Sequence, residues 1–125
     1  SGLANVTLHG EFKRLEEVAS PEHFAYLHTT AWEGTPTILF DVAAAGLPIC
    51  APAIGGIVDF IANDHLVQGH EDVDAFVDRL MLLRGSAEER DMAVSRQAGS
   101  MKRQRTWAAF LDNLNGATCY ISSEA

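Results

Sequence analysis

The chain has 125 residues, 47% of them apolar and 21% charged, which suits one globular domain with a single core. Nine basic against seventeen acidic residues give a net charge of −8, and this acidity argues against nucleic-acid partners, which attract Lys and Arg. No apolar run approaches the roughly 20 residues that span a bilayer, and we expect no secretory leader. Two cysteines, Cys50 and Cys119, are too few for a disulfide framework. We therefore expect a cytoplasmic α/β or α domain.

Strand-like and helical segments alternate along the N-terminal half. Four short segments combine β-branched or aromatic residues with bounding Gly or Pro and are predicted to be strands: Asn5–His9, Phe24–Thr29, Leu47–Ala51 and His65–Val67. A short helix is predicted within residues 11–20 and another at Ile57–Ile61. Between them, a helix is predicted over Thr37–Ala45, with Pro36 in its first turn and Gly46 as a left-handed cap.

Helical periodicity dominates the C-terminal half. An apolar stripe behind an acidic first turn predicts one amphipathic helix; its members are Val73, Phe76, Val77 and Leu80. Ser86 and Glu89 have the spacing of a capping box, which predicts the start of the next helix. A third stripe, which ends at Asn115–Gly116, consists of Trp107, Phe110, Leu111 and Leu114.

Strands that alternate with helices predict βαβ units and a mostly parallel sheet. Three or four strands are few for a doubly wound sheet, because a parallel sheet needs cover on both of its faces. We therefore expect a partial, Rossmann-like doubly wound sheet of three to four mostly parallel strands with flanking helices. Residues 1–116 are expected to form this half-domain, whose first strands lie outside the chain, and residues 117–125 a tail.

Two loops are candidates for ligand binding, because ligands of open parallel sheets bind where the carboxyl ends of strands lead into helices. The loop from Thr30 to Pro36 carries Glu33 into a predicted helix, whose first N–H groups suit a phosphate. Asp41 lies about two helical turns further on. Two carboxylates that flank N–H donors suit a ligand with a diphosphate between two sugars. Equally, Glu33 can simply cap the helix while Asp41 is an exposed surface residue.

The second loop contains the tandem glycines Gly55 and Gly56 ahead of a predicted short helix. Glycines at this place let a ligand approach the backbone closely. They equally allow an ordinary tight turn, so this loop by itself identifies no site.

The segment from Glu33 to Ile57, EGTPTILFDVAAAGLPICAPAIGGI, resembles the donor-site signature of glycosyltransferase family 4. The family pattern runs Glu-Gly-x-Pro-x-x-x-x-Glu-Ala-x-Ala-x-Gly-x-Pro-Val and continues into a Gly-Gly loop with a following acidic residue, here Asp59. The resemblance extends over residues 5–115. It implies the C-terminal part of the donor-binding domain of a retaining, metal-independent enzyme with the GT-B fold. Such enzymes transfer a sugar from a nucleotide diphosphate sugar, their substrate, to an acceptor hydroxyl, without a cofactor.

The resemblance also implies the roles of individual residues. Glu33 corresponds to the catalytic-site acid that contacts the hydroxyls of the donor sugar, and Asp41 to the acid that binds the nucleotide ribose. The backbone around Gly34 lines the sugar, the N–H groups that open the helix hold the diphosphate, and the loop after the first strand approaches the nucleobase. The donor-binding residues implied in this way are Gly10, Phe12, Thr30, Gly34, Thr35, Pro36, Thr37, Ile38 and Asp41.

The chain departs from the family pattern in three respects. Asp41 replaces a Glu and is one methylene shorter, and Val42 replaces the usual Ala. The basic residues that neutralise the diphosphate belong to a segment upstream of this chain, and Lys13 and Arg14, its only basic residues before residue 79, are not part of that motif. A phosphoryl leaving group needs fixed positive charge. We therefore expect the parent protein to be a hexosyl-type glycosyltransferase and this chain alone to be inactive.

No metal site is expected, because the pairs His23/His28 and His65/His70 are each five residues apart instead of the four that a helical zinc site uses. Near the C-terminus, Lys102, Arg103 and Arg105 adjoin Trp107. Many members of the family act at membranes, so a peripheral contact of the parent enzyme with the inner face of the membrane remains open. Three charges are few for anchoring, and a solvated helix face explains them equally well.

A second hypothesis is a non-catalytic interaction or oligomerisation module built on the same half-fold. A partial sheet exposes an edge of unpaired backbone groups, which favours pairing with another chain. The expected partners are therefore a nucleotide-sugar donor and an unidentified acceptor, and a homodimer through the exposed sheet edge remains open.

Overall fold

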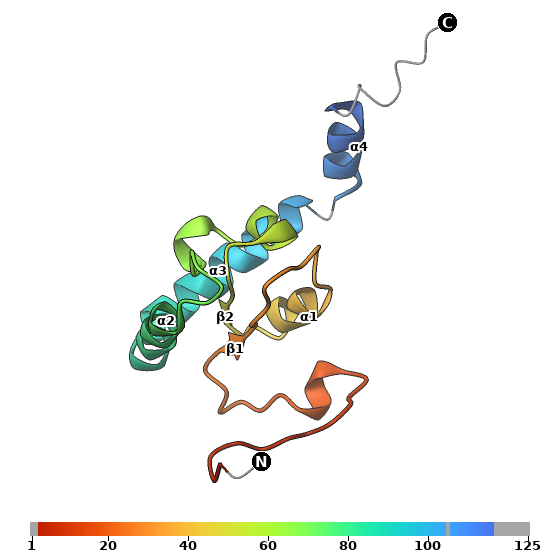
Figure 1. The fold of residues 1–125 in the computed structure, drawn as a ribbon. Helices are drawn as coiled ribbons and strands as arrows, with labels where there is room; N and C mark the ends of the chain where they lie inside the picture. The colour runs from red at the N-terminus through yellow and green to blue at the C-terminus, as the bar shows by residue number, and fades with distance from the viewer. Residues whose placement is uncertain (1–2, 105, 117–125) are drawn as a thin grey trace, which may run out of the picture.

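The structure, a computed structural model, describes residues 3–104 and 106–116 and is a mixed α/β fold (Figure 1). Its elements, in chain order, are a 3-10 turn at Leu15–Glu17, strand β1 (Tyr26–Leu27), helix α1 (Ile38–Ala44), strand β2 (Ile49–Cys50), 3-10 turns at Gly55–Asp59 and Asn63–His65, and helices α2 (Val73–Gly85), α3 (Ala87–Gln104) and α4 (Trp107–Gly116). Among the described residues, no helix combines the length and apolarity needed to cross a membrane.

The sheet is parallel and has two strands within the described part of the chain. Tyr26 N–H donates to the Pro48 carbonyl (2.8 Å) and His28 N–H to the Cys50 carbonyl (2.9 Å). α1 connects the two strands, so β1, α1 and β2 form the βαβ unit that the alternation of segments predicted. Both strands lie inside their predicted ranges, but each is shorter than predicted.

Residues 5–9, which were predicted to form the first strand, do not form a strand in the structure. Its apolar residues Val6 and Leu8 are exposed, at 42% and 76% of their surface. β-branched residues favour a strand only where a neighbouring strand and a buried face are available to them. Residues 5–9 have neither, so they stay in an irregular conformation (Figure 1).

The predicted fourth strand, residues 65–67, is reduced to one parallel bridge, in which Val67 pairs with Pro52. The reason is the buried side chain of Gln97 in α3. Its Oε1 accepts from Ile49 N–H (2.8 Å) and its Nε2 donates to the Leu47 carbonyl (3.0 Å). The amide therefore occupies the ladder positions that a longer strand would use. The sheet consequently lacks the three to four strands expected from the sequence.

Two clusters of buried side chains cover the sheet. One joins α1 to β2 and to the turn at Gly55–Asp59 through Leu39, Val42, Ile49 and Ile57, all at most 1% exposed, and the rings of Phe40 and Phe60 stack at 5.3 Å. The other joins β2 to α2 and α3; its buried members are Cys50, Val67, Phe76, Leu83 and Ala93. α3 contacts both α1 and α2 and so links the two clusters.

Helix α2 has a side-chain cap at its start and one buried face, and the sequence predicted this face only in part. The Asp72 carboxylate caps it by accepting from Ala75 N–H (3.0 Å). Phe76 and Leu83 are buried, whereas Val73 and Val77 are 70% and 49% exposed. The predicted stripe is therefore wrong for these two valines, because the face of α2 that meets the sheet is rotated toward Leu83.

The remaining C-terminal predictions have mixed outcomes. Ser86 Oγ accepts from Glu89 N–H (3.1 Å), which confirms the predicted start of α3. α4 coincides with the predicted third stripe, but Trp107 is 72% exposed. The side chains of Phe110 and Leu114, and all of Arg105, Cys119 and the tail 117–125, lie outside what the structure describes.

Buried His65 connects the turn at Asn63–His65 to two helices. Arg79 Nη2 in α2 lies 2.8 Å from its Nδ1, and Arg96 Nη1 in α3 lies 3.0 Å from its Nε2. Asp64 pairs with Arg96, and Glu89 lies 3.7 Å from Arg79. Burial lowers the pKa of His65, and the Arg79 guanidinium lowers it further. A protonated His65 would add a third positive charge between two guanidinium groups, so the neutral form fits this place.

Candidate functional site

The loop before α1 leads into a helix as the sequence predicted, but the helix begins at Ile38 with Thr37 as its N-cap, so Pro36 lies just ahead of it. Thr30 Oγ1 donates to the Trp32 carbonyl (2.8 Å), which folds the loop back just ahead of Glu33. The first hydrogen bonds of α1 run from Leu39 N–H to the Pro36 carbonyl (3.2 Å) and from Phe40 N–H to the Thr37 carbonyl (3.0 Å). The N–H groups of Thr37 and Ile38 come before these bonds, as expected at a helix start.

The two loops that the sequence analysis treated separately lie against each other. Gly56 N–H donates to the Gly34 carbonyl (2.8 Å). A Cβ atom on Gly55 would overlap the Glu33 carbonyl oxygen, and a Cβ on Gly56 would come within 2.5 Å of Thr35 Oγ1. Gly55 also has a φ of +50°, which disfavours other residues. The tandem glycines thus bring the second loop into contact with the backbone of Glu33–Thr35.

His28 adjoins the Glu33 carboxylate and was not among the predicted site residues. It follows β1 directly, and its Nε2 lies 3.5 Å from Glu33 Oε2, with side chains that are 14% and 31% exposed. Nε2 is buried and, among the described residues, has no partner aligned for a hydrogen bond. The sequence signal that could have found His28 is its position at the end of a predicted strand, just before the loop that carries Glu33.

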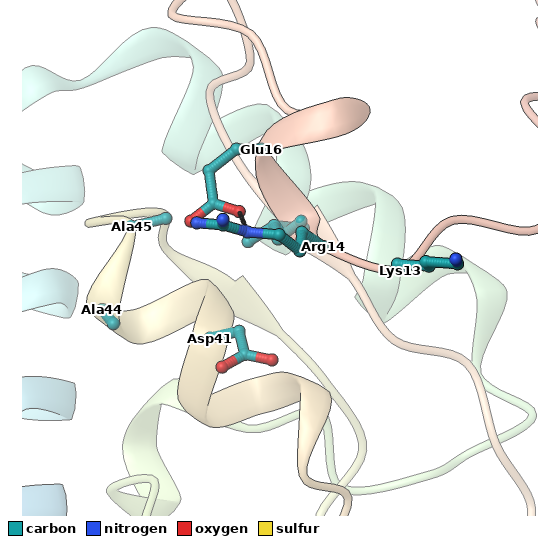
Figure 2. A pocket seen from close by; sticks show the side chains of 7 residues that line it. Lys13, Arg14, Glu16, Asp41, Ala44 and Ala45 are labelled. Atoms are coloured by element: carbon teal, nitrogen blue, oxygen red, sulfur yellow. Dashed lines mark hydrogen bonds and ion pairs between the residues drawn. The ribbon is translucent and has the colours of Figure 1, made fainter.

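Asp41 lies on α1 and lines a pocket of about 400 Å3 (Figure 2). The opposite side of this pocket is formed by the 3-10 turn at Leu15–Glu17 and the two basic residues before it, Lys13 and Arg14. Arg14 Nε donates to Glu16 Oε2 (3.3 Å). A backbone hydrogen bond, and then Arg14, lower the pKa of the Glu16 carboxyl. The only basic residues of the N-terminal half therefore lie beside one of the two predicted carboxylates.

Phe12 lines a second hollow, of about 340 Å3, together with Tyr26 and Leu27 of β1. Leu15 is buried and borders both this hollow and the Asp41 pocket, so the two are neighbours. Gly10 has a φ of +72°, which turns the chain just before Phe12. The predicted loop of Gly10 and Phe12 thus lies near Asp41, although the strand predicted ahead of it does not form.

The arrangement places hydrogen-bond acceptors at two positions around α1, with cationic side chains beside one of them. Glu33 lies before the first turn of α1, where its backbone contacts Gly55. Asp41 lies near the middle of α1, and the pocket beside it is also lined by Lys13 and Arg14. Carboxylates accept hydrogen bonds from hydroxyl groups, and cationic side chains attract phosphate. Within the described residues, no group of three or more His, Cys, Asp and Glu side chains is placed to hold a metal ion. Comparison with known proteins finds no matching family model, no matching curated protein and no matching solved structure.

Proposed function

We propose that this chain is the donor-binding part of a retaining glycosyltransferase of the GT-B class. The observation that carries the proposal is the contact between the Glu33–Thr35 loop and the Gly55–Gly56 loop, which follow two neighbouring parallel strands. Ligands of doubly wound sheets bind beyond the carboxyl ends of such strands. The two observed strands and the Val67 bridge would then belong to a larger Rossmann-like sheet.

The proposed site has a sugar end and a nucleotide end. At the sugar end, Glu33 accepts hydrogen bonds from hydroxyls of the donor sugar, and the backbone of Gly34 and Thr35 lines its ring. The N–H groups of Thr37 and Ile38 receive the diphosphate, supported by the positive end of the α1 dipole.

At the nucleotide end, Asp41 accepts hydrogen bonds from the ribose hydroxyls. The pocket beside it, of about 400 Å3, lies in the range of known ligand pockets, about 300–1,000 Å3. Because Asp is shorter than the Glu of the family pattern, the ribose must approach α1 more closely here. Lys13 adds positive charge at this end, where Arg14 is paired with Glu16, and Phe12 offers an apolar surface to the nucleobase.

The proposed reaction moves the sugar to an acceptor hydroxyl and releases the nucleoside diphosphate. The N–H groups at the start of α1 would stabilise the charge that develops on the leaving diphosphate. Acceptor binding belongs to the rest of the parent enzyme, so this chain is proposed to bind the donor without turning it over. Glu33→Ala in the parent enzyme is expected to depress transfer strongly, and unchanged turnover would remove Glu33 from the site.

Calorimetric titration of this chain with UDP, GDP, ADP and their sugar conjugates tests the proposal. We expect saturable binding of one nucleotide and its conjugates. Glu33→Gln should weaken binding of the sugar conjugates only, whereas Asp41→Asn should weaken binding of the nucleotide as well. Glu71→Gln, at a carboxylate that is 89% exposed and outside both loops, serves as the control. Failure of every nucleotide and conjugate to bind, or equal binding by all variants, would contradict a donor site here.

A further inference from the structure

The imidazole of His28 is held in place before any ligand binds. Its backbone N–H donates to the Cys50 carbonyl (2.9 Å), which fixes the residue at the end of the β1 ladder. Its ring stacks on Tyr26, with centroids 6.2 Å apart, because residues two apart on an extended chain share one face. The side chain is 14% exposed. Strand and ring together leave His28 little freedom to move relative to the sheet.

The buried Nε2 atom of His28 has one acidic neighbour among the described residues, Glu33 Oε2 at 3.5 Å. The two atoms are close but not aligned for a hydrogen bond. A buried nitrogen without a partner is costly, so any ordering of the Glu33 side chain that aligns the pair is favoured. A carboxylate offers about four lone-pair sites. Glu33 can therefore accept the Nε2–H of His28 and still accept hydrogen bonds from a ligand.

A second histidine–carboxylate pair of nearly the same length shows what burial adds. His70 Nε2 lies 3.6 Å from Glu71 Oε1, but these side chains are 39% and 89% exposed. Water screens that pair, and the interaction of exposed groups contributes little. The His28–Glu33 pair is much less hydrated, at 14% and 31%, so a hydrogen bond formed between these two groups has a larger effect on the position of Glu33.

We propose that His28 is a positioning residue for Glu33: its Nε2–H donates to Oε2 and directs the other carboxylate oxygen toward the hydroxyls of the donor sugar. This inference rests on the proposed function of the site. Because His28 acts through Glu33, it affects recognition of the sugar and leaves recognition of the nucleotide unchanged. It is not among the residues that line the Asp41 pocket.

Two substitutions separate this role from a structural one. His28→Phe keeps a ring of similar size for the stack on Tyr26 and removes both nitrogens, whereas His28→Gln restores an N–H group near the position of Nε2. We expect His28→Phe to weaken binding of the sugar conjugate about tenfold, about 1.4 kcal/mol. Binding of the nucleotide without its sugar should not change. His28→Gln should recover part of the loss. His70→Phe is the matched control and should bind both ligands normally.

A measurement without ligand tests the contact itself. In long-range 1H–15N spectra of the chain, Glu33→Gln should move the His28 Nε2 resonance and leave that of His70 in place. An unmoved His28 resonance, or equal losses for conjugate and nucleotide in His28→Phe, would overturn the role of His28 and leave the donor-site proposal standing. If the unsubstituted chain binds no nucleotide and no conjugate, the donor site and the role of His28 fall together.

Discussion

Replacing Gly55 by alanine tests the contact on which the proposed donor site depends. The added Cβ would overlap the carbonyl oxygen of Glu33, a backbone atom that no side-chain rotation can move away. Overpacking of this kind costs about 1–3 kcal/mol, and a left-handed conformation, here φ +50°, costs a further 1–2 kcal/mol or so. We therefore expect Gly55→Ala to lower the free energy of unfolding by about 2–5 kcal/mol, a large share of a small domain's stability.

Two other glycines separate these contributions in urea denaturation. Gly46 has a φ of +72°, and no atom beyond its two chain neighbours lies within 4 Å of the position that a Cβ would take there, so Gly46→Ala should show the backbone cost alone. Gly34 has an ordinary φ and equally open surroundings, so Gly34→Ala should change stability little. If Gly55→Ala costs no more than Gly46→Ala, the two loops do not approach each other as described, and the argument for a shared site is refuted.

Three further outcomes follow from buried polar groups. Gln97→Leu leaves two backbone groups beside β2 without partners, which should lower the free energy of unfolding in urea denaturation by about 1–3 kcal/mol for each of them. Burial holds the pKa of His65 below its unfolded value of 6.5, so the unfolded chain binds the proton more readily. The free energy of unfolding should therefore fall as the pH drops through and below 6.5, and His65→Gln should reduce this dependence of stability on pH. Burial raises the pKa of the Cys50 thiol to about 11; with Cys119 replaced by Ser, a thiol reagent should label Cys50 only when the chain unfolds, and rapid labelling of the folded chain would contradict its burial.

Local chemistry was enough to predict α1. Pro36 and Gly46 bound the helix by their own backbone preferences, and the observed range, Ile38–Ala44, lies inside the predicted one. Gly46 has the left-handed φ of +72° that the sequence predicted for it. The caps at Asp72 and Ser86 are local in the same way, since each bonds a backbone N–H three residues on. Signals that act between residues three or four positions apart can be recognised in a single sequence.

The errors arise where distant residues decide the structure. Residues 5–9 have strand-forming composition but no neighbouring strand among the described residues, and composition does not reveal that. The bridge at Val67 is short because Gln97, about fifty positions from the backbone groups that it bonds, fills the adjoining ladder positions. Likewise, Lys13 and Arg14 line the Asp41 pocket only because the 3-10 turn at Leu15–Glu17 packs next to α1. None of these pairings leaves a periodic pattern in the sequence.

The two carboxylates of the proposed site differ in their surroundings, and this difference supports separate roles. Glu33 is 31% exposed and lies between the half-buried imidazole of His28 and a backbone contact with Gly55. Asp41 is exposed and faces a pocket that is lined by Lys13, Arg14 and Glu16, with Arg14 paired to Glu16. Hydrogen bonds to a partly buried acceptor strengthen as water is excluded, whereas those to an exposed one compete with solvent. Recognition of the sugar hydroxyls therefore fits the Glu33 end, where geometry is fixed, and hydrogen bonding to the ribose hydroxyls fits the open end at Asp41.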